Sequence, residues 1–286
     1  MDHDARPTAD IHLSDVDFER FQEFFYRKTG IQFGENKRYF VDRRVAQRMH
    51  ETGSTTFRSY LTFVKFEVGQ HEFQRLVDIM TVNETYFYRE AFQFDCMVQD
   101  VLGECLVNRR GHGPLRIWSM PCSTGEEIYS IALYLLERWP KLREIDVELV
   151  GADINETALL QARRGLYGPR AVQNLPASIL NRYFTPKDGE TLEIKQDIRD
   201  AVDFVLCNIC DKFIPPTLSN FDIVFCRNML IYFDTLSQKR AVENIFSALR
   251  PGGFLFLGHS ESMSRVSSVF TVRTFADSLA YQRPLS

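Results

Sequence analysis

The stretch LRIWSMPCSTGEEIYSIA, residues 115–132, decides the fold of this chain of 286 residues. Its first part, Leu115 to Met120, is apolar and predicts a buried strand. A loop of small residues, 121–125, follows, and a segment with helical periodicity begins at Glu126. In a parallel sheet the loop after the first strand lies at the carboxyl edge, where ligands bind. Because Gly125 lets the backbone approach a ligand closely, the sequence predicts a nucleotide-binding turn.

Strands and helices alternate from residue 115 onward. Predicted strands cover 115–120, 147–153, 201–208, 221–226 and 253–258, and predicted helices cover 126–138, 156–164 and 237–249. This alternation is typical of an α/β fold with a doubly wound, Rossmann-like parallel sheet. After Gly258 the segments 269–274 and 278–283 predict two short strands, which we expect to form an antiparallel terminal hairpin.

The connection between Tyr167 and Asp200 is longer than a crossover usually needs. Two segments, 181–185 and 191–195, are predicted strands, and they flank the turn sequence Pro-Lys-Asp-Gly at 186–189. Asp-Gly at the centre of such a turn favours a β-hairpin. We therefore expect a small antiparallel β-subdomain, inserted at about 167–200.

Residues 13–82 carry helical periodicity only and predict a helical amino-terminal domain. Its first helix is predicted between Ser14, a capping residue, and Gly30, a helix terminator. Residues 83–114 are expected to form an interdomain linker and a leading helix. Residues 115–286 are expected to form the domain that contains the sheet.

The composition is that of an ordinary globular protein, with 44% hydrophobic and 25% charged residues. No apolar run approaches the roughly 20 residues that a membrane span needs, and the polar amino terminus has no signal-peptide pattern, so we expect a cytoplasmic protein. The net charge of −4 argues against a general attraction to nucleic acid. Cys207 and Cys210 have a metal-like spacing, but without a second pair or a histidine cluster we expect core packing and no metal.

Two acids after the loop distinguish between possible ligands. A phosphate-binding loop presents bare backbone amides to an anion at the start of a helix. Glu126 and Glu127 stand at that position in this chain. They favour a cationic, hydroxyl-rich nucleoside over a dinucleotide. S-adenosylmethionine has that character, because it carries an ammonium and a sulfonium but no phosphate.

Polar residues follow three further strands of the predicted sheet. Asp153 ends the second strand, where a carboxylate accepts hydrogen bonds from ribose hydroxyls; the alternative is a plain helix cap. Asn208 ends the third strand, and Arg227 and Asn228 end the fourth. These residues reach the same edge of the sheet, where they could frame the adenine and the reacting end of the ligand or cap neighbouring helices. The segment 227–232 is not the Asn/Asp-Pro-Pro-aromatic box of many enzymes that methylate base nitrogens.

A basic helix is predicted at 36–49. Against one acid, Asp42, it carries five cations: Lys37, Arg38, Arg43, Arg44 and Arg48. Such a run is usually a solvated helix face. In an otherwise acidic protein it can also be a docking face for an acidic partner, and the pattern leaves both interpretations open.

The segment NETYFYR, residues 83–89, is predicted to lie between the domains. Its Asn, Thr and Arg could close over a ligand at the sheet edge. Tyr86, Phe87 and Tyr88 instead predict packing between the domains. Spacing alone does not decide between these interpretations.

Five blocks of sequence carry a resemblance to a known family. They are TVNETYFYRE at 81–90, PCSTGEE at 121–127, ADIN at 152–155, FDIVFCRNMLIYFD at 221–234 and LRPGGFLFLGHSE at 249–261. In order and spacing they resemble the CheR family of bacterial chemotaxis receptor glutamate methyltransferases, over about residues 14–283. The resemblance implies an S-adenosylmethionine-binding sheet, an all-helical amino-terminal domain and a small inserted β-subdomain.

The resemblance also implies roles for individual residues. The residues that match family positions around the cofactor are Asn83, Thr85, Arg89, Glu127, Asp153, Asn208, Ile209, Arg227 and Asn228. Arg89 and Tyr232 match residues near the transferred methyl group and are the implied catalytic residues. Glu127 is favoured over Glu126 as the main cofactor contact, and His259 is interpreted as structural.

The implied reaction methylates glutamate side chains on receptor cytoplasmic domains, giving glutamate 5-O-methyl esters and S-adenosylhomocysteine. Methyl-accepting chemotaxis receptors are the implied partners, and their acidic helical bundles would suit the basic helix. The turn at 185–190 is shorter and poorer in glycine than in relatives that bind a receptor carboxyl-terminal peptide, so no tight binding of such a peptide is expected. A monomer is expected. The alternative is a methyltransferase that acts on a non-chemotaxis signalling protein or a small molecule.

Overall fold

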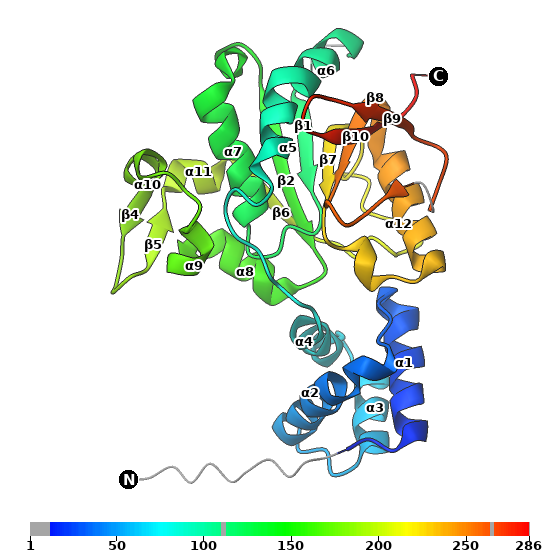
Figure 1. Ribbon diagram of the computed structural model, residues 1–286. Helices are drawn as coiled ribbons and strands as arrows, with labels where there is room; N and C mark the ends of the chain where they lie inside the picture. Colours follow the sequence, from blue (N-terminus) through cyan, green and yellow to red (C-terminus); the bar gives the residue numbers. More distant parts are fainter. Residues whose placement is uncertain (1–11, 110–112, 264–265, 286) are drawn as a thin grey trace. The chain divides into compact units, whose positions relative to one another are not determined.

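The computed structural model describes residues 12–109, 113–263 and 266–285 (Figure 1). The chain divides into two compact units. The first ends at Val82 and also takes in Tyr232–Asp234, and the second comprises Asn83–Ile231 and the chain from Thr235 onward. Within the described ranges, no helix is long and apolar enough to cross a membrane.

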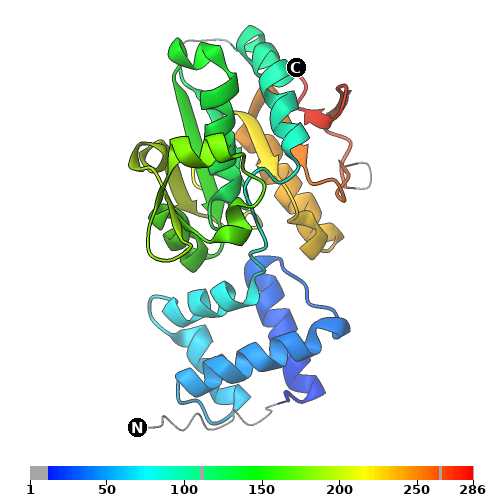
Figure 2. The same ribbon diagram turned by 60° about the vertical axis from the view of Figure 1, so that its left-hand side comes forward.

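The first unit is built from helices (Figure 2). They are α1 (Asp15–Thr29), the 3-10 turn η1 (Glu35–Lys37), α2 (Arg38–Glu51), α3 (Phe57–Phe66) and α4 (His71–Met80). Ser14 caps α1 by accepting a hydrogen bond from the Asp17 amide at 3.1 Å, and Gly30 ends it with a φ of 77°. Three phenylalanines of α1 are buried along one face, which gives the unit an aromatic core.

A seven-stranded sheet, in the order β6-β2-β1-β7-β8-β10-β9, organises the second unit. Its strands are β1 (Leu115–Ser119), β2 (Val147–Asp153), β6 (Val202–Leu206), β7 (Phe221–Cys226), β8 (Leu249–Leu257), β9 (Thr271–Thr274) and β10 (Leu279–Gln282). The first five strands in this order run parallel, β10 pairs antiparallel with β8, and β9 pairs antiparallel with β10. The predicted α/β fold class and the terminal hairpin are confirmed.

The second unit also contains helices. They are α5 (Ala91–Cys96), the π-helical turn η2 (Met97–Val101), α6 (Leu102–Asn108), α7 (Glu126–Arg138), η3 (Pro140–Arg143), α8 (Glu156–Arg164) and α12 (Thr235–Ala248), while the short turn η4 (Leu230–Tyr232) follows β7. Every residue of β7 is buried, as expected when both faces of a parallel sheet are covered. The rings of Phe225 and Phe256 stack with centroids 4.7 Å apart, so aromatic packing joins β7 to β8.

A separate three-stranded antiparallel sheet is inserted in the chain between α8 and β6 (Figure 1). It contains β3 (Leu166–Tyr167), β4 (Phe184–Pro186) and β5 (Leu192–Ile194), with the helices α9 (Pro169–Val172), α10 (Ala177–Tyr183) and α11 (Gln196–Asp200). The predicted β-subdomain is confirmed. A strand over 181–185 is wrong in its first half, because α10 buries Ile179 and continues to Tyr183 before the chain becomes extended.

Candidate cofactor site

Asp153, at the end of β2, fixes the loop that follows β1. Its Oδ2 accepts a hydrogen bond from the Ser123 amide at 2.8 Å, and its Oδ1 accepts one from the Asn155 amide at 2.9 Å. The side chain that caps α8 is Asn155, which accepts a hydrogen bond from the Ala158 amide at 2.7 Å. The alternative interpretation of Asp153 as a plain helix cap is therefore wrong.

The loop itself has the features of a ligand cradle. Ser123 and Gly125 have left-handed backbone conformations, with φ of 49° and 94°, which turn the chain sharply into α7. The Ser123 hydroxyl is buried and makes no hydrogen bond within the described residues. Buried polar groups are normally satisfied, so this hydroxyl is suited to a ligand that itself carries hydroxyl groups. The loop thus fits the ribose part of a nucleoside cofactor.

Glu127 is held in place at the start of α7 by two side chains. Ser119 donates a hydrogen bond to Oε1 at 2.7 Å, and Arg227 Nη1 donates one to Oε2 at 3.1 Å. Burial raises the pKa of Glu127, while the nearby Arg227 opposes that shift. A carboxylate fixed in this way retains lone pairs that can accept from an ammonium group.

Arg227 is the centre of this arrangement and is itself buried, with its side chain 1% exposed. Its Nη2 donates to the Arg89 carbonyl at 2.8 Å and lies 3.1 Å from Glu90 Oε2. Burial would raise the pKa of Glu90, but Arg227 and His259 outweigh it and hold that pKa below its ordinary value. The Arg227 guanidinium is enclosed by protein groups. The geometry therefore favours an indirect role in ligand binding, in which Arg227 holds Glu127 in position.

Glu126 lies in a different environment from Glu127. Its Oε2 accepts a hydrogen bond from Thr124 Oγ1 at 2.6 Å, and burial raises its pKa. The Tyr167 hydroxyl donates to the Thr124 carbonyl at 2.9 Å. Glu126 therefore belongs to a network that joins the cofactor loop to β3 of the inserted subdomain.

Glu261 is a residue of this edge that sequence reasoning missed. Its carboxylate accepts hydrogen bonds from the backbone amides of Asn228, Leu230 and Gly258 at 2.8, 2.7 and 2.9 Å. Burial raises the pKa of Glu261, and these amides oppose the shift. Glu261 ties the chain after β7 to the chain after β8. An acid three residues beyond the glycine that ends an apolar strand was the available signal.

The sequence after β6 forms a compact turn. Asn208 Oδ1 accepts a hydrogen bond from the Cys210 amide at 3.0 Å, and the Ile209 side chain is buried. Cys207 and Cys210 are buried thiols, as the core-packing interpretation predicted. Across the described ranges, no group of three or more His, Cys, Asp or Glu side chains could hold a metal ion.

The segment 83–90 contributes both to the core and to the edge of the second unit. Phe87 is fully buried and packs edge-on against Tyr167 and Phe184, with centroid distances of 4.8 and 5.4 Å. The expectation that Phe87 packs between the domains is therefore wrong, because the insertion supplies its partners. Asn83 is exposed, whereas Thr85 and Arg89 are half-buried.

The remaining implied catalytic residue, Tyr232, lies in η4 and is 41% exposed. By its contacts it groups with the first unit, since the Gln32 amide donates to its carbonyl at 3.3 Å. Its neighbour Asp234 accepts a hydrogen bond from the Tyr26 hydroxyl at 2.9 Å. Tyr232–Asp234, which follow β7 in the chain, are thereby held in the first unit.

One cation of the predicted basic helix is buried. Arg48 is 5% exposed and donates to both carboxylate oxygens of Glu72, at 2.9 and 2.6 Å. The Tyr60 hydroxyl donates to the same carboxylate at 2.9 Å. Both interpretations of the basic run, as a solvated face or as a docking face, are therefore wrong for Arg48, because Glu72 on α4 supplies a buried partner.

The other four cations of the helix vary in exposure. Arg44 lies over the Phe40 ring at 3.5 Å and donates to a backbone carbonyl, and Arg38 forms an ion pair with Asp15 at 2.5 Å. Lys37 and Arg43 are exposed. These two residues are therefore the most accessible charges of the basic run.

Two family models match the chain, one after the other. The all-alpha domain of CheR methyltransferases matches residues 16–81, and their SAM-binding domain matches residues 83–277. Chemotaxis protein methyltransferase 2 of Vibrio cholerae is 46% identical over 275 residues, which cover 96% of this chain and 95% of that protein. The chemotaxis protein methyltransferase of Escherichia coli is 34% identical over 278 residues, covering 93% and 91%. Both matches span nearly the whole chain, and this protein belongs to the CheR methyltransferase family and uses S-adenosylmethionine as its cofactor.

Proposed function

We propose that this protein transfers the methyl group of S-adenosylmethionine to glutamate side chains of chemotaxis receptors. The products are glutamate 5-O-methyl esters and S-adenosylhomocysteine, as for a protein-glutamate O-methyltransferase. The observation that carries the proposal is the match of both domains, in order, to proteins named as chemotaxis methyltransferases. The arrangement around Glu127 supports it, because that carboxylate suits the cofactor's ammonium.

Two parts of the cofactor, the ribose and the ammonium, have groups in the second unit that suit them. In this proposal Asp153 accepts a hydrogen bond from the ribose, and the Ser123 hydroxyl donates one to it. Glu127 accepts a hydrogen bond from the ammonium group. Asn83, Thr85, Arg89, Asn208, Ile209 and Asn228 complete the proposed set of cofactor contacts. Arg227 and Ser119 keep Glu127 in position. When bound, the cofactor supplies a methyl group that is activated by the sulfonium.

The proposed nucleophile needs little chemical help. A glutamate with an ordinary pKa of about 4.3 is already ionised at neutral pH, so its oxygen can attack the methyl group without a general base. Positioning then dominates the rate, since in-line transfer requires reacting atoms about 3 Å apart. We assign to Arg89 the anchoring of a carboxylate and to Tyr232 the orientation of the nucleophile through its hydroxyl.

Receptor recognition is assigned in part to the exposed cations Lys37 and Arg43, with Arg38 and Arg44 beside them on α2. The inserted sheet offers little to an added peptide strand. Its outer strands β3 and β4 have two and three residues, and β4 ends at Pro186. Short edges and proline both oppose strand addition. We therefore propose that receptor binding does not depend on a carboxyl-terminal peptide of the receptor.

Incubation with labelled cofactor and a receptor cytoplasmic fragment, followed by alkali, tests the proposal. A glutamate methyl ester is hydrolysed by base and releases volatile labelled methanol. A methyl group on nitrogen or carbon would survive the same treatment and would exclude esterification. A receptor fragment in which the modified glutamates are replaced by aspartate is the matched control, because it keeps the charge of the substrate.

A further inference from the structure

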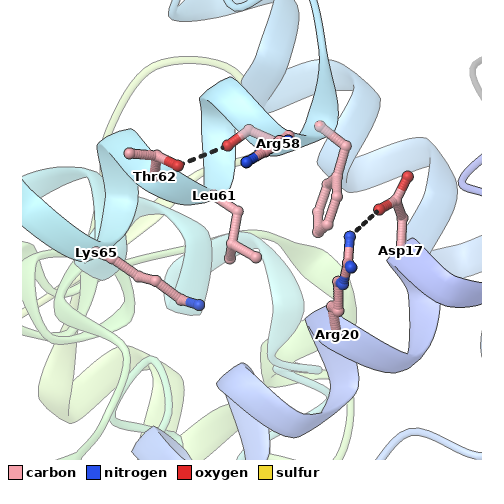
Figure 3. A pocket seen from close by; sticks show the side chains of 7 residues that line it. Asp17, Arg20, Arg58, Leu61, Thr62 and Lys65 are labelled. Carbon is pink, nitrogen blue, oxygen red and sulfur yellow. Dashed lines mark hydrogen bonds and ion pairs between the residues drawn. The ribbon is translucent and has the colours of Figure 1, made fainter.

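A pocket of about 350 Å³ lies between α1 and α3 of the first unit (Figure 3). Helix α1 contributes Asp17 and Arg20 to its lining. Helix α3 contributes Phe57, Arg58, Leu61, Thr62 and Lys65. Phe57 and Leu61 are buried and give the pocket an apolar base, and Figure 3 shows Arg20 and Lys65 extending from the two helices toward the same space.

The charges around this α1–α3 pocket are unbalanced. Three cations, Arg20, Arg58 and Lys65, face a single acid, Asp17. The Arg20–Asp17 contact is long, at 3.4 Å, and the Arg20 side chain is 60% exposed. Among the residues that the structure describes, Arg58 and Lys65 form no ion pair, and Lys65 Nζ lies 5.3 Å from the centre of the Phe24 ring. The result is local positive potential on a protein whose net charge is −4.

The spacing along α3 indicates the kind of ligand that this potential suits. Arg58 and Lys65 are seven residues apart, which is about 10 Å along an α-helix. Phe57 and Leu61 lie between and beside these cations and form the apolar base of the pocket. Two cations two turns apart over an apolar base match an amphipathic helix whose carboxylates are also two turns apart. A small anion would leave the apolar base unused.

We propose that the α1–α3 pocket is a docking site for an acidic amphipathic helix of the protein substrate. This inference rests on the proposed function, which makes that helix a segment of the receptor. It assigns to Arg20, Arg58 and Lys65 a role in recognition that is separate from the cations of α2. Carboxylates of the bound helix pair with Arg58 and Lys65, and its apolar stripe covers the base formed by Phe57 and Leu61.

The test compares two charge reversals in the full chain. Arg58→Glu with Lys65→Glu should weaken binding of a receptor cytoplasmic fragment by about tenfold or more, because attraction is replaced by repulsion. Arg75→Glu is the matched control, since Arg75 is exposed on α4 of the same unit and lies outside the pocket. Binding is measured directly by calorimetry at low salt, and S-adenosylhomocysteine affinity should be unchanged in both variants.

Equal receptor affinity of the double variant and the wild-type protein would overturn the inference, and so would an equal loss in Arg75→Glu. If the double reversal lowers the unfolding midpoint, Arg58→Gln with Lys65→Gln replaces it and should weaken binding several-fold. A failure of the proposed function would look different from a failure of this inference. In that case the wild-type protein would bind the receptor but form no alkali-labile methyl group.

Discussion

The Asp153 carboxylate makes a structural contact and also has a proposed role in cofactor binding. It holds the Ser123 amide at 2.8 Å and stands where ribose hydroxyls are expected. Replacement Asp153→Ala should therefore weaken S-adenosylhomocysteine binding by about 1.5–3 kcal/mol, the range for hydrogen bonds to a charged partner. Calorimetry measures this change. An unaltered affinity in a folded variant would remove Asp153 from the cofactor site.

Tyr232 is expected to act in the transition state more than in binding. If its hydroxyl orients the attacking carboxylate, Tyr232→Phe should lower turnover and leave S-adenosylhomocysteine affinity nearly unchanged. Steady-state methylation kinetics and calorimetry on the same preparation separate the two effects. Equal losses in turnover and cofactor affinity would instead indicate a role in cofactor binding or packing.

Arg48 is a charged residue that stabilises the folded state of the first unit. Its guanidinium is enclosed with the Glu72 carboxylate, so Arg48→Met leaves that carboxylate buried without its partner. The free energy of unfolding should fall by about 3–5 kcal/mol, as for other broken buried ion pairs. Denaturant unfolding measures the loss. Arg43→Met on the exposed side of the same helix is the control and should change stability little; a similar loss in both variants would contradict this account.

Individual residues of the site were predictable only where a pattern marked them. The acids after the small-residue loop and the polar residues at strand ends could be recognised from the sequence, because strand ends converge at one edge of a parallel sheet. The burial of Arg48 could not, since its partner Glu72 lies on another helix. Glu261 was missed for a similar reason, because two of the backbone amides that it accepts from, those of Asn228 and Leu230, belong to the chain after β7.

At the scale of elements, a tyrosine hydroxyl connects the inserted subdomain to the cofactor loop. Tyr167 on β3 donates to the Thr124 carbonyl at 2.9 Å, next to the buried Glu126. Tyr167→Phe removes only that donor, so it should loosen the loop and weaken S-adenosylhomocysteine binding by about 0.5–1.5 kcal/mol. The apparent Michaelis constant for the cofactor should rise by the factor that corresponds to this loss of binding free energy.

A second tyrosine of the insertion provides the control. The Tyr183 hydroxyl donates to Glu137 on α7 at 2.5 Å and does not contact the cofactor loop. Tyr183→Phe should therefore leave cofactor affinity unchanged. If both variants bind S-adenosylhomocysteine as tightly as the wild-type protein, the contact between β3 and the loop has no part in cofactor binding.

The elements of the sheet domain were largely predictable because apolar strands and periodic helices alternate with clear boundaries. The insertion was predictable in kind but less so in detail. A polar, short segment such as 177–186 carries weak periodicity, and its division into α10 and β4 depends on burial of Ile179 and Phe184 against distant residues. Phe87 was misassigned for the same reason, since its neighbours Tyr167 and Phe184 are far away in the sequence.

At the scale of the whole molecule, the chain combines a helical unit that carries cations with a sheet unit that carries carboxylates at its ligand edge. This division suits an enzyme whose substrate is a large acidic protein and whose cofactor carries a positive charge. In the proposed function the first unit recognises the receptor, and the second holds the methyl donor through Glu127 and Asp153.

The most direct test of this account is the position of the transferred methyl group. A receptor cytoplasmic fragment is incubated with the protein and S-adenosylmethionine, digested under mildly acidic conditions, and analysed by tandem mass spectrometry. The proposed function predicts methyl groups on glutamate side chains, and their loss when the protein carries Glu127→Gln at low cofactor concentration. Methyl groups on lysine, arginine or amide nitrogens, or a receptor left unmodified by active, cofactor-binding protein, would contradict it.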